Sequence, residues 1–163
     1  MTRFSRLVGS LLMAVASLAP VRPALGQQAD KDAVVAVVKR FLEAISTSDS
    51  AMARSTMMDE GALVSTVAGQ APAFRKQTFA AFLGMLGGGR KFLERMWNPQ
   101  VLIDSGLATV WTPYDFHLDG KFSHCGIDVF TLLKGPDGWK ISHVAYTVQR
   151  QGCAPSPLGP PAN

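Results

Sequence analysis

The sequence predicts an α+β domain in which a curved antiparallel sheet wraps around a long N-terminal helix. Helical spacing of apolar residues dominates the first half of the chain, whereas strand-like segments separated by turn residues fill the second half. Helices followed by consecutive strands are typical of α+β domains rather than of parallel βαβ folds. A sheet curved around a helix leaves a cavity, which is where a small ligand would bind.

The first 26 residues have the three parts of a secretory signal peptide. Arg3 and Arg6 make the start positive, and residues 7–19 form an uncharged apolar run. Ala24-Leu25-Gly26 then offers small residues at a cleavage site. The apolar run is shorter than the roughly 20 residues that span a bilayer, which favours cleavage over the alternative of a membrane anchor. We therefore expect a periplasmic or secreted protein without membrane contact after cleavage.

Cleavage would change the charge of the protein. The first 26 residues contain three of the 16 basic residues and none of the 12 acidic ones, so the formal net charge falls from +4 to +1. No cluster of basic and aromatic residues remains, and we expect no binding to nucleic acid. Residues 27–150 suffice for one domain with its own core. Residues 151–163 are rich in proline and are expected to be disordered.

The helical half begins at Asp30, which can cap a helix that extends to Ile45. A short second helix is expected at 51–58, followed by a strand at 61–68. A third helix follows, and the three glycines at 87–89 end it. The apolar stripe of the first helix consists of Val34, Val37, Val38, Phe41, Leu42 and Ile45, and that of the third consists of Phe79, Phe82, Leu83 and Leu86.

The second half predicts strands joined by short turns. Asn98-Pro99 interrupts the first of them, because proline donates no hydrogen bond to a sheet. Asp119-Gly120 is typical of a type I′ hairpin turn, which needs positive φ at both positions. A second turn is expected at 135–138. The strands are expected at residues 91–97, 101–104, 107–118, 122–133 and 139–149.

The two turns predict a strand register. The first would place Asp115 opposite His124 and Trp111 opposite Asp128, and the second would place Phe130 opposite His143 and Asp128 opposite Ala145. Residues two apart in a strand share a face. One face would then carry Trp111, Asp115, His117, His124, Asp128, His143 and Thr147, and the other Tyr114, Phe116, Cys125, Ile127, Val129 and Tyr146.

This register suggests an acid–base pair in the cavity. Asp128 and His143 would be diagonal neighbours within hydrogen-bonding reach. A carboxylate beside an imidazole is a common device for proton transfer, because each group shifts the pKa of the other. The alternative is a buried structural pair, and Trp111 fits core packing better than a ligand platform. The histidine spacing matches no metal-binding motif, so we expect neither a metal nor a cofactor.

The two cysteines are Cys125 and Cys153. In an oxidising compartment they are expected to form a disulfide that ties the end of the chain to the outer face of the sheet. The alternative is a buried, unreactive Cys125 and a free Cys153.

Two segments, Gly126-Ile127-Asp128-Val129-Phe130 and Gly138-Trp139-Lys140-Ile141, resemble the nuclear transport factor 2-like superfamily. This superfamily includes ketosteroid isomerase, SnoaL-like polyketide cyclases and limonene epoxide hydrolase. The resemblance covers about residues 30–150, and residues 108–153 look most similar to a lumazine-binding-like branch of exported proteins. It implies a curved sheet that forms a cone closed by helices, the cystatin-like fold, and commonly a homodimer.

The resemblance carries over only part of the known catalytic sites. Asp128 occupies the position of the aspartic acid in the isomerase oxyanion hole. Phe41 stands where the isomerase has its tyrosine, and Val64-Ser65-Thr66 has no acid where the isomerase has its base. Isomerase activity by that mechanism is therefore not expected, and the fold alone does not restore it. The Asp-Arg-Asp set of the epoxide hydrolase is not placed either, although Arg95 could share the cavity with Asp128.

Three functions fit these observations. The first is binding of a small, largely apolar molecule. The second is a cofactor-free isomerase, cyclase or hydrolase that uses Asp128 and His143, and the third is an accessory or dimerisation domain with a filled cavity. A cavity of roughly 300 Å³ or more beside Asp128 would favour the first two, and a raised pKa of Asp128 would favour the enzyme. The expected ligand contacts are Trp111, Asp115, His124, Asp128, His143 and Phe41.

Overall fold

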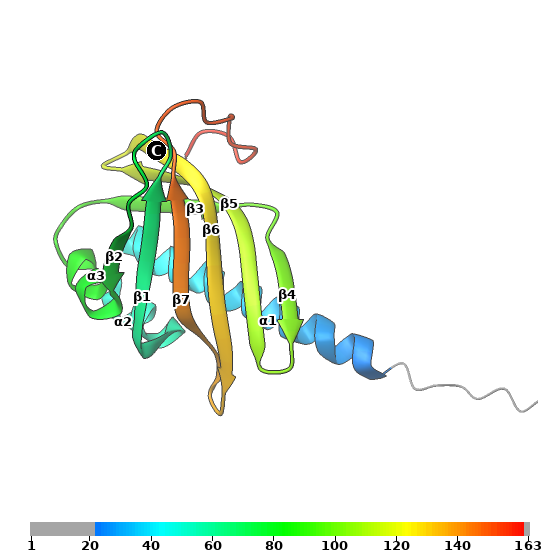
Figure 1. Ribbon diagram of the computed structural model, residues 1–163. Helices are drawn as coiled ribbons and strands as arrows, with labels where there is room; N and C mark the ends of the chain where they lie inside the picture. The colour runs from blue at the N-terminus through cyan, green and yellow to red at the C-terminus, as the bar shows by residue number, and fades with distance from the viewer. Residues whose placement is uncertain (1–21, 162–163) are drawn as a thin grey trace, which may run out of the picture.

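The structure is a computed structural model that describes residues 22–161 (Figure 1). Most of the predicted signal peptide lies outside these residues and stays a prediction. None of the described helices is long and apolar enough to cross a membrane. The helices are α1 (Arg22–Thr47), α2 (Ser50–Thr56) and α3 (Phe79–Leu86). The strands are β1 (Met57–Val67), β2 (Arg75–Thr78), β3 (Phe92–Met96), β4 (Gln100–Asp104), β5 (Leu107–Leu118), β6 (Lys121–Gly135) and β7 (Gly138–Val148).

The strands form one curved sheet in the order β2-β1-β7-β6-β5-β3, and β4 also pairs with β5. The predicted α+β class is confirmed, but the sheet is mixed rather than wholly antiparallel, because β1 runs parallel to β7. The strand β2 was not predicted. Its sequence, Arg-Lys-Gln-Thr, has no apolar alternation that would indicate a strand.

The predicted hairpin turn is confirmed, and Asp119 and Gly120 both have positive φ. Leu118 therefore pairs with Lys121 as expected. The register then shifts by one residue, because Ser123 is an extra residue in β6 between the partners of Phe116 and His117. A bulge of this kind inserts one unpaired residue and moves every later residue to a different partner. The expected pairs Asp115–His124 and Trp111–Asp128 are therefore wrong.

A second bulge alters the pairing of β6 with β7. Lys134 pairs with Trp139 as predicted, but Ser142 is an extra residue between the partners of Leu132 and Thr131. The expected pairs Phe130–His143 and Asp128–Ala145 are therefore wrong as well. Phe130 pairs with Val144, and Asp128 pairs with Tyr146.

Helix α1 runs across the concave face of the sheet (Figure 1). It begins at Arg22, upstream of the expected start, so it crosses the predicted cleavage site after Gly26. Asp30 is therefore not the cap. Its carboxylate instead accepts hydrogen bonds from Lys134 Nζ at 2.6 Å and from Trp139 Nε1 at 3.3 Å. These contacts hold the helix against the hairpin between β6 and β7.

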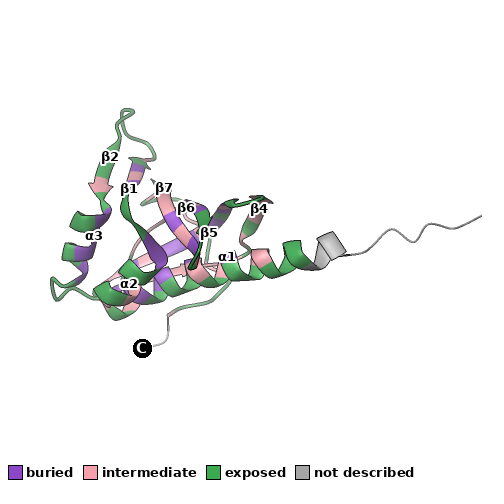
Figure 2. Ribbon diagram, turned by 90° about the horizontal axis from the view of Figure 1, so that it is seen from below, coloured by how far each residue is buried: buried purple, intermediate pink, exposed green. Residues whose placement is uncertain are grey.

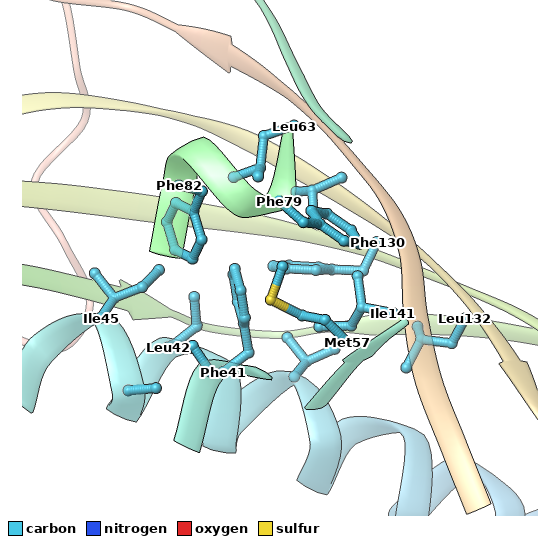
Figure 3. Packing of buried hydrophobic residues seen from close by; sticks show 14 of the residues in the cluster. Phe41, Leu42, Ile45, Met57, Leu63, Phe79, Phe82, Phe130, Leu132 and Ile141 are labelled. Carbon is cyan, nitrogen blue, oxygen red and sulfur yellow. The ribbon is translucent and has the colours of Figure 1, made fainter. Parts of the chain in front are cut away.

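The apolar stripe of α1 packs as its spacing predicts. Phe41 is 2% exposed and contacts the rings of Phe82 in α3 and Phe130 in β6, at centroid distances of 5.4 and 5.9 Å. Figure 3 shows these three rings between α1, α3 and the sheet. Figure 2 shows that the other side of α1 is exposed. The helix is therefore amphipathic, and its apolar side supports one wall of the cavity described below.

The predicted disulfide between Cys125 and Cys153 is present, with the Cα atoms 6.1 Å apart. It ties the end of the chain to the outer face of β6. Residues 151–161, expected to be disordered, contain no helix or strand. They are nevertheless placed beside the sheet by this bond and by pairing of the Cys125 and Gln149 backbones.

Loss of the disulfide should destabilise the domain. The bond closes a loop with a sequence separation of 28 residues. Restriction of the unfolded chain by a loop of this length is worth about 3–4 kcal/mol. Urea unfolding of Cys153→Ser should show a loss of that order, and addition of a reductant should lower the stability of the wild type but not that of the variant. Equal stability of both proteins under oxidising conditions would contradict this expectation.

Candidate functional site

A cavity of about 500 Å³ lies between α1, α3 and the concave face of the sheet. This volume exceeds the roughly 300 Å³ at which ligand pockets begin. Most of its wall is apolar, and its polar residues come from different strands. The apolar residues include Phe41, Ile45, Leu63, Phe82, Phe92, Phe116, Leu118, Phe130, Val144 and Val148; the interior polar ones are Ser65, Gln77, Glu94, Tyr114, His124, Asp128 and Tyr146.

Two carboxyl groups face each other inside this cavity. Asp128 in β6 is only 2% exposed, and Glu94 in β3 is half-buried. The two strands flank β5, in which Tyr114 and Phe116 are on the same face. The Asp128 and Glu94 side chains are close enough for hydrogen bonding between them. One oxygen of Asp128, Oδ2, has no hydrogen-bond partner.

The electrostatics of this pair favour one shared proton. Burial raises the pKa of Glu94 to about 7, although the hydrogen bond from Asp128 acts in the opposite direction. Burial and the nearby charge of Glu94 raise the pKa of Asp128 well above its usual range. Both carboxyl groups therefore keep their protons to a higher pH than free carboxyl groups do. Two carboxylates in such a site cannot both ionise easily, because like charges repel in a medium that hydrates them poorly.

Tyr114 crosses the cavity floor between these strands. Its hydroxyl donates a hydrogen bond of 2.8 Å to the backbone oxygen of Thr147 in β7. Gly126 lies opposite Tyr114 in β6, and a side chain there would clash with the same Thr147 backbone oxygen. Burial, and then the charge of Asp128, raise the pKa of Tyr114. The tyrosine is therefore neutral, and its proton is directed to the backbone rather than into the cavity.

His124 is also neutral near pH 7. Burial, and then the positive charge of Arg150, lower the pKa of His124 to about 4. Its ring packs on Phe116 with the centroids 4.9 Å apart, and its Nδ1 atom is 3.0 Å from Ser123 Oγ. A neutral imidazole at the cavity wall can donate or accept a hydrogen bond but carries no charge.

Of the expected ligand contacts, the structure brings Phe41, His124 and Asp128 to the cavity wall. Trp111, Asp115 and His143 lie on the outer face of the sheet, which corrects their expected positions. Trp111 is 41% exposed there. His143 is next to the cavity-lining Val144 and so points the other way. The expected Asp128–His143 pair is therefore not formed, because the bulge at Ser142 turns His143 to the outer face. The bulge at Ser123 accounts for the positions of Trp111 and Asp115.

The outer face has an ion cluster of its own. Arg95 donates two hydrogen bonds to Asp115, at 2.9 and 2.6 Å, and His117 Nε2 is 3.5 Å from the same carboxylate. Burial alone would raise the pKa of Asp115, but the hydrogen bonds from Arg95 hold it below its usual value. Arg95 therefore does not share the cavity with Asp128. No group of three metal-ligating side chains occurs within residues 22–161.

Glu94, Tyr114 and Tyr146 were missed as cavity residues. The available signal for Glu94 was its position between Phe92 and Met96, because a charged residue on the apolar face of a strand indicates a buried role. However, the adjacent Arg95 places a charge on the opposite face of the same strand. The charge pattern therefore does not indicate which face of the strand is buried. The predicted register puts the tyrosines on the outer face, and the bulges in β6 and β7 turn them to the cavity face.

Comparisons with solved structures identify the fold. A nuclear transport factor 2-like protein with a cystatin-like fold from Novosphingobium aromaticivorans superposes with a TM-score of 0.63 at 15% identity, over 86% of this chain and 95% of that one. A superfamily protein from Salmonella enterica gives 0.61 at 16%, over 80% and 99%. A Streptomyces avermitilis protein, for which a dehydratase role has been suggested, gives 0.61 at 14%, over 75% and 97%.

These likenesses show that the chain has the nuclear transport factor 2-like, or cystatin-like, fold, as the sequence resemblance implied. No protein-family model and no curated protein matches the sequence. The SnoaL-like or lumazine-binding-like branch thus remains a resemblance. Proteins of one fold can differ in function, so the function must be argued from the cavity itself.

Proposed function

We propose that this domain binds a small, largely apolar molecule in the cavity, with the Glu94–Asp128 pair as its polar anchor. The observation that carries the proposal is the buried Asp128 Oδ2 atom, which has no partner and belongs to the wall of a cavity of about 500 Å³. A buried polar atom without a partner costs about 1–3 kcal/mol. A hydroxyl group of a ligand that donates a hydrogen bond to Oδ2 would remove that cost.

The size and lining of the cavity also support binding. A cavity of about 500 Å³ with mostly apolar walls and a few polar side chains has the size and composition of a small-molecule site. The accessory-domain alternative requires a filled cavity and is therefore less well supported. Export to the periplasm would give the protein access to molecules outside the cytoplasm. Export and the homodimer stay predictions.

A second candidate function is cofactor-free proton transfer. It is favoured by the Glu94 pKa of about 7 beside a carboxyl whose pKa is also raised. Glu94 could then act as the base and Asp128 as the acid, in place of the expected Asp128–His143 pair. A dehydratase role has been suggested for the Streptomyces protein, and elimination of water also requires an acid and a base. Turnover that depends on both carboxyls, rather than retention of an unchanged ligand, would separate this function from binding.

A probe that fluoresces in apolar surroundings can test the binding proposal. We expect N-phenyl-1-naphthylamine, a neutral molecule, to bind the wild type at one site. Ser65 is buried and lines the cavity, so Ser65→Trp should fill part of it and lower the affinity at least tenfold. Thr66→Trp is the matched control, because it adds the same side chain to the adjacent, exposed position on the opposite face.

Circular dichroism should show that both variants fold. Equal probe binding by Ser65→Trp and Thr66→Trp would contradict the proposal, since the probe would then not occupy the cavity. Absence of probe binding to the wild type would also count against it.

A further inference from the structure

The rim of the cavity is distinct from its interior in charge. Of the residues that line the cavity, five are exposed, and four of these five are cations. The four cations come from separate parts of the chain: β2, the loop between α3 and β3, and the segment after β7. Their convergence is therefore a property of the fold rather than of one basic stretch of sequence. The five are Arg75, Lys76, Met85, Arg90 and Arg150.

The register explains how the first of these cations reaches the rim. Arg75 in β2 pairs with Ser65 in β1, and Ser65 points into the cavity. Directly opposed residues in paired strands share a face, so Arg75 lies at the cavity side of the sheet edge. Arg150 follows β7 at the same end of the sheet, next to the end of β1, where Val67 pairs with Val148.

The rim cations are only weakly compensated. Arg90 Nε lies 3.8 Å from Asp119 Oδ2, and both side chains are more than half exposed. Arg75, Lys76 and Arg150 form no salt bridge with a carboxylate of residues 22–161. The positive charge of Arg150 also reaches inward, where it contributes to the lowered pKa of His124.

The interior offers the opposite environment to an anion. Its two carboxyls, Glu94 and Asp128, would repel a second negative charge, whereas a neutral polar group could bond to them. The apolar walls favour a hydrocarbon or aromatic body between the two ends. A ligand that suits all three zones has an anionic group, an apolar body and a neutral polar atom.

We infer that the ligand is an anionic amphiphile, whose carboxylate, sulfonate or phosphate lies among the rim cations while its apolar body fills the cavity. This inference rests on the proposed binding function and adds the chemical class and the direction of entry. Ligand charge would be recognised at the mouth by Arg75 and Arg150, and not at the cavity floor.

Two fluorescent probes with the same aromatic skeleton test this inference. 8-Anilinonaphthalene-1-sulfonate has a sulfonate that N-phenyl-1-naphthylamine lacks. In the double variant Arg75→Gln, Arg150→Gln, we expect the dissociation constant of the sulfonate to rise about three- to tenfold, as loss of two exposed ion pairs implies. Affinity for the neutral probe should change less than twofold. The difference in sulfonate affinity between the wild type and this variant should shrink at high salt, because exposed charges are screened.

The matched control is Lys39→Gln, Arg40→Gln, which removes two charges from the exposed side of α1. The affinities of both probes should be unchanged in this control variant. Ser65→Trp should weaken the binding of both probes. An unchanged sulfonate affinity in the rim variant would overturn the inference, as would an equal loss in the α1 variant or an equal loss of both probes. These outcomes leave the proposed function intact as long as the neutral probe still binds the wild type and binds Ser65→Trp more weakly.

Discussion

Replacing Phe41 with alanine should lower the free energy of unfolding by about 3–5 kcal/mol, the usual cost of removing a buried aromatic ring. Phe41 is 2% exposed and connects α1 to the rings of Phe82 and Phe130. Its loss would remove contacts on both sides and merge the new space with the existing cavity. Urea unfolding followed by circular dichroism would measure the change.

The control for this prediction is Phe74→Ala, which removes the same ring from a position that is 87% exposed. Its stability should stay within about 0.5 kcal/mol of the wild type. A decrease in the free energy of unfolding below about 1 kcal/mol in Phe41→Ala would contradict this prediction. It would mean that this ring does not hold α1 to the sheet as one wall of the cavity.

The second large effect concerns pH. Burial raises the pKa of Glu94 from 4.5 to about 7, so the folded state binds its proton more tightly than the unfolded state. Stability from this source is complete below pH 4.5 and is lost as the pH rises through about 7, at no more than about 1.4 kcal/mol per pH unit. The raised pKa of Asp128 has the same sign and extends the loss to higher pH.

His124 acts in the opposite direction at lower pH. Its pKa falls from 6.5 to about 4 on folding, so its contribution grows as the pH rises between these values. The difference between the wild type and Glu94→Gln removes this term, because the histidine is common to both. Relative to the wild type, Glu94→Gln should gain stability as the pH rises from 5 to about 7, and the gain should level off above that pH. A difference that is independent of pH would contradict the shared-proton description of the pair.

Much of the fold could be predicted from local sequence. The helical spacing around Phe41 and the turn at Asp119-Gly120 act over a few residues, and both are confirmed. The disulfide was expected from the number of cysteines and the expected compartment, and it is present. The parallel pairing of β1 with β7 was missed, because it joins segments far apart in the chain and no local pattern specifies it.

The candidate site was predicted less completely, for a specific physical reason. Each bulge adds one residue, Ser123 in β6 and Ser142 in β7, and each moves the strand beyond it by one position. A shift of one residue exchanges the two faces of a strand. The sequence predicts the cavity position of Asp128 correctly, but it predicts His143 as the partner where the structure has Glu94. Serine has no conformational signature that would indicate a bulge from sequence alone.

Native mass spectrometry of the protein purified from the organism that produces it would show directly whether the cavity holds a ligand. We expect the wild type and Thr66→Trp to carry one small molecule of constant mass, released on denaturation, and Ser65→Trp to carry none. A wild-type protein whose mass is that of its chain alone, or a bound molecule retained equally by Ser65→Trp, would contradict the claim that this cavity holds the ligand.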